Sequence, residues 1–165
     1  MPILDVNSLE IFSRSPEQTR RIGMRLGASL QKGDVICLQG ELGAGKTTLV
    51  QGLAQGWGSL DPVSSPTFIL VNIYRKPDAE MLFHLDTYRI SSNEEAEELD
   101  IEEMINQGPL VIEWPERIRS LLPDQYLWVA LGYQGEEVRS ILLTPYGKRF
   151  RIMVSNLRQS VFGVV

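Results

Sequence analysis

The sequence predicts an α/β fold with antiparallel strands added toward its C-terminal end. Three observations predict it. Short apolar runs typical of buried strands alternate with helical patterns along the 165 residues. One of these runs leads into a glycine-rich loop that a helix follows, and two later runs are joined by a polar turn, as in a hairpin. We expect one domain over residues 1–165, with a core at about 10–145 and a tail at 146–165.

The expected elements follow from caps, periodicity and β-rich composition. The first helix can begin after Ser15, a good cap that precedes Pro16, and the third after Ser92 or Asn93. The turn signals "KPDA" and "QGEE" each join two strands. The predicted helices cover residues 16–31, 46–57, 91–105 and 148–161. The predicted strands cover residues 34–39, 68–74, 80–86, 109–114, 126–133 and 138–145.

Composition excludes several classes of protein. With a net charge of −5 and a pI of about 5.0, the surface as a whole repels nucleic acid, so any RNA contact needs a local basic patch or a partner. No apolar run approaches the roughly 18 residues of a membrane span. The N-terminal stretch is acidic where a secretory signal would be basic. Cys37, the single cysteine, lies in an apolar run and is expected to be a small buried hydrophobe. We expect a cytoplasmic protein without membrane contact.

Residues 40–47 fit the phosphate-binding pattern G-x-x-x-x-G-K-[ST] in full, between a predicted strand and a predicted helix. A glycine turn with an accidental lysine is the plain alternative, and this context argues against it. Glycines let the backbone N–H groups approach a polyphosphate, Lys46 can neutralise β- and γ-phosphate oxygens, and the Thr47 hydroxyl can ligate Mg²⁺. Thr48 adds a hydroxyl near the α-phosphate. The predicted nucleotide-binding residues of this segment are Gly40, Glu41, Leu42, Gly43, Ala44, Gly45, Lys46, Thr47 and Thr48.

Two acids end predicted buried strands, where ligands bind in open α/β sheets. One of Asp86 and Glu113 can hold Mg²⁺ and the other can orient a water molecule; the residues alone do not assign which, and a solvated carboxylate is the plain alternative. Thr67, within "SSPTF" at 64–68, is a candidate γ-phosphate or Mg²⁺ sensor, although the segment taken alone favours a plain proline-containing turn. His84, the only histidine, lies beside Asp86, and a lone strand histidine is more often a packing residue than a catalyst.

The base is expected to be adenine. A GTPase would carry an Asn-Lys-x-Asp string, which this sequence lacks. Nor does a D-x-x-G string follow the strand at 80–86, where the residues are Asp86-Thr87-Tyr88-Arg89. We therefore expect ATP and Mg²⁺ as the cofactors.

A set of motifs resembles one family. "GELGAGKTT", "SPTF" with Tyr74 six residues on, "FHLDTYR" and "VIEWPER" resemble the bacterial TsaE (YjeE-type) ATPases, in order and spacing, over roughly residues 10–145. The resemblance implies a three-layer, P-loop NTPase-like fold whose sheet is mainly parallel. It also implies roles for the site residues. Lys46 contacts the phosphates, Thr47 and Glu113 ligate Mg²⁺, Asp86 is a second essential acid near the γ-phosphate, Trp114 and Glu116 line the nucleotide site, and Ser15 and Arg139 approach the base or ribose.

The resemblance also implies a role in the cell. ATP hydrolysis, slow without partners, would support the TsaD–TsaB complex as it forms N6-threonylcarbamoyladenosine at position 37 of tRNAs reading codons that begin with A. Contact with tRNA would be indirect, through that complex, which agrees with the acidic pI. A small-molecule P-loop kinase is the alternative, although no compact arginine cluster indicates a lid. A nucleotide-dependent binding switch is a third hypothesis. Residues 94–103, with seven acids, are either a solvated helix face or a docking surface for a basic partner.

Overall fold

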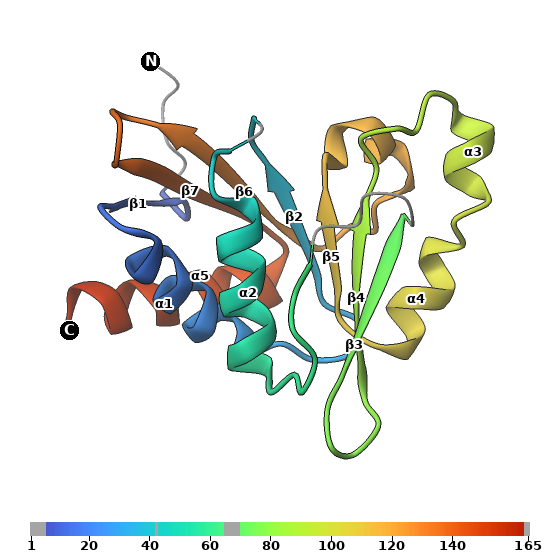
Figure 1. Cartoon of the computed structure of the whole chain (residues 1–165), viewed down its shortest axis with the longest axis horizontal. Helices are drawn as coiled ribbons and strands as arrows, with labels where there is room; N and C mark the ends of the chain where they lie inside the picture. The colour runs from blue at the N-terminus through green and yellow to red at the C-terminus, as the bar shows by residue number, and fades with distance from the viewer. Residues whose placement is uncertain (1–5, 42, 65–69, 164–165) are drawn as a thin grey trace.

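The computed structural model describes residues 6–41, 43–64 and 70–163. Its strands form one seven-stranded sheet in the order β1-β7-β6-β2-β5-β4-β3 (Figure 1). The strands are β1 (Leu9–Ser13), β2 (Val35–Gln39), β3 (Val71–Arg75), β4 (Met81–Asp86), β5 (Leu110–Glu113), β6 (Tyr126–Tyr133) and β7 (Arg139–Tyr146). The helices are α1 (Pro16–Gly27), α2 (Lys46–Trp57), α3 (Asn93–Glu97), α4 (Ile101–Gln107), the 3₁₀ helix η1 (Pro115–Leu121) and α5 (Lys148–Phe162).

The centre of the sheet is parallel and its borders are antiparallel. β2 pairs in parallel with β5 and with β6, and β5 pairs in parallel with β4. β3 joins β4, β7 joins β6 and β1 joins β7, each antiparallel, so that β1 again runs in the direction of β6. Most strands therefore share one direction, which confirms the predicted fold class. The carboxyl ends of β2, β4 and β5 meet at one edge, where the site is built.

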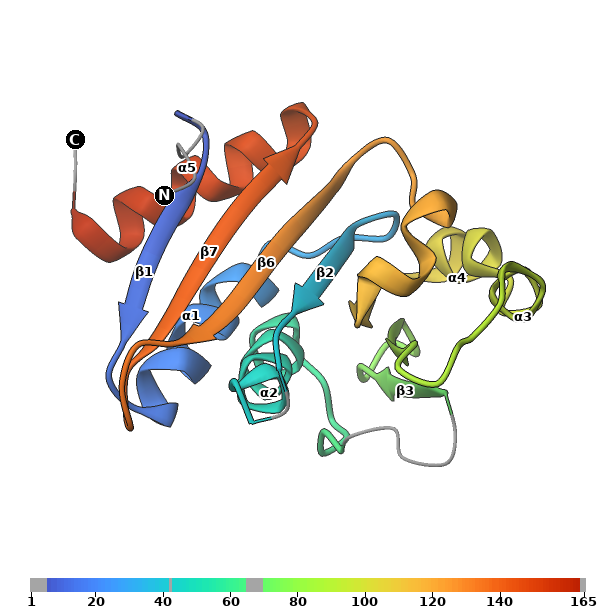
Figure 2. The same cartoon turned by 90° about the horizontal axis from the view of Figure 1, so that it is seen from above.

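Helices cover the two faces of the sheet unequally. The apolar residues of α1, α2 and α5 form one core cluster with β1, β7, β6 and β2. On the opposite face, α3, α4 and η1 form a second cluster with β2, β5 and β4. In Figure 2, β1 and β7 face the viewer with α5 behind them. Three layers are thus present around β2 and β5, while the described helices cover β1 and β7 on one face.

The sequence signals for helix ends act as expected. Ser15 accepts a hydrogen bond from the backbone N–H of Gln18, and Pro16 is the first residue of α1. Ser92 caps α3 in the same way. Cys37 is fully buried in β2, and burial raises the pKa of its thiol far above the ordinary value, as expected of a small buried hydrophobe. Within the part of the chain described, no helix is long and apolar enough to cross a membrane.

The helix expected at 91–105 is wrong as one element, because the structure has two short helices there. Asp100, between them, takes a left-handed conformation with φ of 52°. In a continuous helix Asp100 would share the face of buried Ala96, four residues earlier. The break instead turns Asp100 outward and lets Ile101 and Met104 be buried.

Strand β1 is absent from the sequence prediction. Its burial alternates, with Leu9 and Ile11 inside and Glu10 and Phe12 outside. The first helix also ends earlier than expected, at Gly27 instead of residue 31. Residues 65–69, which include Thr67 and part of the strand expected at 68–74, lie outside the described residues, as does Leu42.

The tail beyond the hairpin completes one face of the sheet. α5 matches the helix expected at 148–161, and Phe150 and Val154 contribute to the core cluster. Arg149 donates to the buried carboxylate of Asp34 at 2.8 Å, which fixes the start of α5 to the turn before β2. The described part of the tail, up to residue 163, therefore belongs to the folded body.

Helix α2, which follows the glycine-rich loop, contacts helix α1 backbone to backbone. The residues at this contact are Gly23 and Gly27 of α1 and Gly52 and Gly56 of α2. A Cβ atom added to Gly52 would lie 2.1 Å from the carbonyl oxygen of Arg20. Because no side chain fits there, the position of α2, whose N-terminus follows the loop, depends on these glycines.

We predict that Gly52→Ala destabilises the protein. Helix propensity alone would favour alanine by about 0.8–1 kcal/mol, so any loss must come from the contact with α1. Overpacking of this kind costs about 1–3 kcal/mol, which would lower the thermal midpoint by roughly 2–12 °C, measured by differential scanning calorimetry. Gly132→Ala is the control, because its Cβ would meet only the side-chain oxygen of Ser140, at 3.0 Å. An unchanged or higher midpoint for Gly52→Ala would contradict the prediction.

Candidate nucleotide-binding site

The glycine-rich loop occupies the turn from β2 into α2. It follows Gln39 and ends where Lys46 opens α2. Gly43 and Gly45 have φ of 83° and 105°, values that L side chains rarely adopt. A Cβ at Gly43 would also lie 2.6 Å from the hydroxyl of Tyr133. The loop shape therefore requires glycine at both positions, and it directs the N-terminus of α2 toward the sheet edge.

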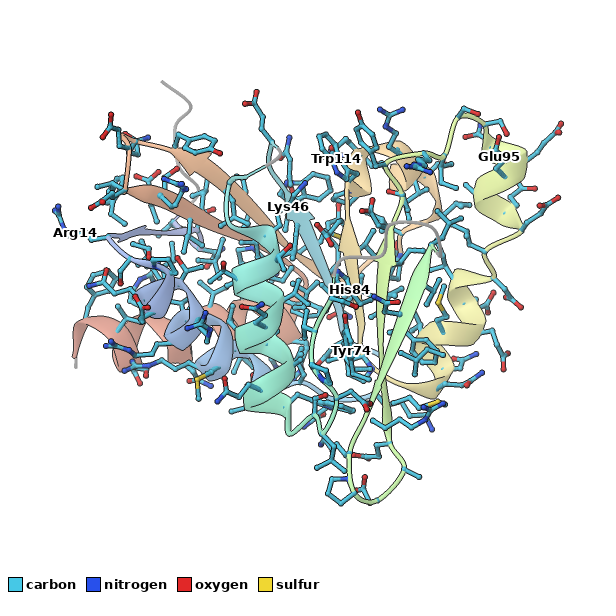
Figure 3. The ribbon with its side chains drawn as sticks, in the orientation of Figure 1. Arg14, Lys46, Tyr74, His84, Glu95 and Trp114 are labelled. Carbon is cyan, nitrogen blue, oxygen red and sulfur yellow. The ribbon has the colours of Figure 1, made fainter. Side chains whose placement is uncertain are left out.

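Lys46 is buried without a hydrogen bond. Its residue is 6% exposed, and among the described residues its ammonium Nζ has no hydrogen-bond partner. The Nζ atom lies 4.0 Å from the ring centroid of Trp114 (Figure 3). Burial lowers the pKa of Lys46, while the negative charges of Glu113, Asp86 and Glu116 oppose that shift. A buried cation without a hydrogen bond at a helix N-terminus is what an anion-binding site requires.

The strand register brings the two predicted carboxylates together. Asp86 of β4 pairs with Glu113 of β5, and Glu113 in turn pairs with Leu38 of β2, just before the loop. Glu113 is 5% exposed and Asp86 is half-buried. Burial raises the pKa of the Asp86 carboxyl, and the negative charge of Glu113 raises it further. A hydrogen bond from the backbone N–H of Tyr88 and the charge of Lys46 act in the opposite direction.

His84 is buried like a packing residue, but it also contacts the site. Its Nε2 lies 2.6 Å from Oε2 of Glu113, and its Nδ1 lies 2.9 Å from the hydroxyl of Tyr74. The sequence carried one signal for this, since His84 and Asp86 are two residues apart and so lie on the same face of β4. It carried none for the contact with Tyr74, which depends on the pairing of β3 with β4.

One cavity, of about 470 Å³, lies on the α1 side of the loop. Its lining includes Ser15, Thr48 and Arg139, from the α1 cap, the first turn of α2 and the β6–β7 hairpin. Gly43 and Gly45 form its loop wall. The structure thus brings together Ser15 and Arg139, which the family resemblance assigned to the base or ribose, and Thr48, which the loop pattern assigned to the α-phosphate.

A second cavity, of about 560 Å³, lies between the loop and η1. Trp114 and Glu116 line it, opposite Gly40, Glu41 and Ala44 of the loop. Trp114 has φ of 59°, a left-handed conformation that is strained for a bulky residue. Its carbonyl accepts a hydrogen bond from the Thr87 hydroxyl, and its ring contacts that of Tyr88, with centroids 4.9 Å apart. This strained turn is what places the indole ring beside Lys46.

Tyr133 was not predicted as a site residue. It lies against Gly43 and beneath Arg139, whose guanidinium carbon is 4.2 Å from its ring centroid. Thr47 is the second residue of α2, next to Lys46. Leu42 and Thr67 lie outside the described residues, so the structure does not place them.

The donor set suits Mg²⁺ held jointly with a nucleotide. Among the described residues no group of three or more His, Cys, Asp or Glu side chains could hold a metal ion. Mg²⁺ usually binds through one or two carboxylates plus the phosphates of a substrate. Glu113, Asp86 and the Thr47 hydroxyl beside the phosphate loop are a set of this kind.

Comparison with known proteins gives one consistent family. Residues 13–141 match the family model described as threonylcarbamoyl adenosine biosynthesis protein TsaE. A Bacillus subtilis tRNA threonylcarbamoyladenosine biosynthesis protein TsaE is 36% identical over 87% of this chain and 89% of its own length. The Treponema pallidum protein of the same name is 39% identical over 81% of this chain and 98% of its own length.

A solved structure agrees with these relatives. The crystal structure of YdiB from Bacillus subtilis superposes with a TM-score of 0.76 at 30% identity, covering 93% of this chain and 95% of that one. These comparisons confirm the resemblance inferred from the motifs. The chain belongs to the TsaE family of threonylcarbamoyladenosine biosynthesis proteins, which places it in the formation of this modified nucleoside in tRNA.

Proposed function

We propose that this protein is a cytoplasmic P-loop ATPase that supports the TsaD–TsaB complex in forming N6-threonylcarbamoyladenosine at position 37 of tRNAs reading codons that begin with A. The observation that carries the proposal is the buried ammonium of Lys46, which has no hydrogen-bond partner among the described residues and lies at the loop that opens α2. Two carboxylates end the neighbouring strands. Such a site complements a nucleotide polyphosphate together with a divalent cation.

In this proposal each residue has one role in binding. The N–H groups of the loop and the ammonium of Lys46 take the β- and γ-phosphates, and the cavity beside Ser15 and Arg139 takes the base and ribose. Thr47 and Glu113 hold Mg²⁺, which supplies charge neutralisation on the phosphate oxygens. Binding gives the Lys46 ammonium the hydrogen-bond acceptors that it otherwise lacks.

We assign to Asp86 the role of orienting the attacking water molecule and accepting its proton. Its raised pKa makes the carboxylate a better proton acceptor than an ordinary aspartate. The water oxygen forms a bond to the γ-phosphorus as the bond to the β-γ bridging oxygen breaks, which releases ADP and phosphate. Hydrolysis is slow in the isolated protein and faster with its protein partners. The seven acids at 94–103 are all exposed, and their negative charge repels the phosphate backbone of RNA. In this proposal the protein partners therefore provide the surface that binds tRNA.

We predict that Lys46→Ala abolishes ATP binding in titration calorimetry at concentrations that saturate the wild type. The phosphates would lose the buried ammonium that lies at the start of α2. Lys76→Ala is the matched control, because Lys76 also lies over a tryptophan, with its Nζ 4.6 Å from the Trp57 centroid, but is remote in sequence from the loop. If ATP affinity is unchanged in Lys46→Ala, Lys46 is not part of the site.

We predict opposite effects of Asp86→Asn on stability and on activity. The folded state disfavours ionised Asp86, since its pKa is raised, so the neutral amide should raise the thermal midpoint at neutral pH without nucleotide or metal. The difference should shrink as the pH falls below the raised pKa of the folded protein and vanish below the ordinary aspartate pKa, where the wild-type carboxyl is neutral in the folded and the unfolded state alike. ATP hydrolysis should fall at least ~100-fold, as it should in Glu113→Gln, while nucleotide binding persists.

Asp78→Asn, in the exposed turn after β3, is the control for both measurements. A lower midpoint for Asp86→Asn would contradict the account of its pKa. Near-normal hydrolysis in both Asp86→Asn and Glu113→Gln would show that other carboxylates act in the reaction.

The pathway is tested in cells depleted of this protein. Mass spectrometry of tRNA nucleosides should show a fall in N6-threonylcarbamoyladenosine that wild type restores and Lys46→Ala does not. If Lys46→Ala also restores the nucleoside, the role of the protein in the pathway does not depend on nucleotide binding at Lys46, which would contradict the proposal. An unchanged nucleoside level on depletion would refute the proposed function and leave a P-loop kinase as the next hypothesis.

A further inference from the structure

A buried row of three side chains leads from the proposed catalytic acids into the protein. Glu113, His84 and Tyr74 are 5%, 0% and 3% exposed, and they come from β5, β4 and β3. In the view of Figure 3, His84 lies between Lys46 and Tyr74. The row continues from the Tyr74 hydroxyl to the carbonyl oxygen of Ser64 at 3.1 Å.

The hydroxyl of Tyr74 has one proton and two acceptors within reach. It lies 2.9 Å from Nδ1 of His84 and 3.1 Å from the carbonyl oxygen of Ser64. That carbonyl already accepts a hydrogen bond from Nδ2 of Asn72, at 2.9 Å. Burial raises the pKa of the Tyr74 hydroxyl, so this group keeps its proton. The shorter distance and the partner already present at Ser64 both favour donation from Tyr74 to His84.

This donation decides where His84 carries its own proton. If Nδ1 accepts from Tyr74, the ring N–H of the imidazole must be on Nε2. Nε2 lies 2.6 Å from the Glu113 carboxylate, so the same tautomer provides the hydrogen bond that Glu113 receives. The opposite tautomer would place an imidazole lone pair against a carboxylate oxygen.

We propose that His84 is a positioning residue that holds the Glu113 carboxylate through a hydrogen bond from Nε2, and that Tyr74 fixes the tautomer that makes this bond possible. The consequence for catalysis rests on the proposed function above. The hydrogen bond restricts rotation of a buried carboxylate that would otherwise adopt several orientations. Holding Glu113 in one orientation lowers the barrier of the chemical step and leaves the loop contacts to the nucleotide unchanged.

The tautomer can be read directly, because the chain has a single histidine. Tag-free protein labelled with ¹⁵N-histidine gives one imidazole spin system by NMR. We expect a protonated Nε2 and a pyridine-type Nδ1 in the wild type, and a changed Nδ1 signal in Tyr74→Phe. Tyr146→Phe, at an exposed ring on β7, is the control and should leave both signals in place. A proton on Nδ1, whether alone or together with one on Nε2, would overturn the role given to Tyr74.

A kinetic comparison tests the role of His84. His84→Gln keeps an N–H group near the position of Nε2, whereas His84→Asn keeps one only near that of Nδ1. In His84→Asn we expect kcat to fall about 10- to 100-fold, as for one lost hydrogen bond to a charged group, with ATP affinity within about threefold of wild type. His84→Gln should recover most of the loss. Equal loss in both variants, or a loss confined to KM, would overturn the proposal.

Two measurements separate this inference from folding and from the proposed function. Rates are normalised to the number of nucleotide-binding sites found by calorimetry, so a fraction of unfolded protein does not count as lost kcat. If the wild type itself hydrolyses no ATP, the proposed function fails while the NMR result still decides the tautomer. A wild type that hydrolyses ATP with equal rates in all His84 variants refutes this inference alone.

Discussion

The burial of the Lys46 ammonium is the constraint on which the rest of the site depends. A buried cation that finds no hydrogen-bond acceptor among the described residues opposes folding, and its lowered pKa expresses that cost. The contact with the Trp114 ring recovers part of this cost, on the order of 2 kcal/mol for a desolvated cation–π pair. Trp114 is itself held in a strained conformation to make that contact. This arrangement does not stabilise the folded protein by itself. An anionic ligand would supply the hydrogen-bond acceptors that the Lys46 ammonium lacks among the described residues.

The fold holds this arrangement through backbone contacts. The parallel pairing of β2 with β5, and of β5 with β4, sets the loop and both carboxylates at one edge of the sheet. The glycine contact between α1 and α2 fixes the helix whose first residue is Lys46. Close backbone packing therefore sets the positions of the cation and of the two acids relative to one another.

The sequence predicts those parts of the molecule whose cause is local. The limits of α2, the Ser15 cap and the position of the glycine-rich loop between a strand and a helix depend on residues adjacent in the chain, and all three agree with the structure. Strand β1 and the break at Asp100 depend instead on what each segment is buried against. The same distinction holds in the site: strand ends pointed to Asp86 and Glu113, whereas the contact of His84 with Tyr74 arises only when β3 pairs with β4.

The opposite pKa shifts of Lys46 and Asp86 have a common cause. Burial disfavours the charged form of each, so the lysine pKa is lowered and the aspartate pKa is raised. Their mutual attraction opposes both shifts without cancelling either, because burial is the largest contribution to each. The negative charge of Glu113 also opposes the shift of Lys46, whereas it adds to the shift of Asp86. A polyphosphate would complement the cation, and a divalent metal ion would complement the two carboxylates. A ligand that carries a polyphosphate and a divalent metal ion would therefore compensate the buried positive charge and the two negative charges together. Phosphate alone or metal alone would compensate only one of them.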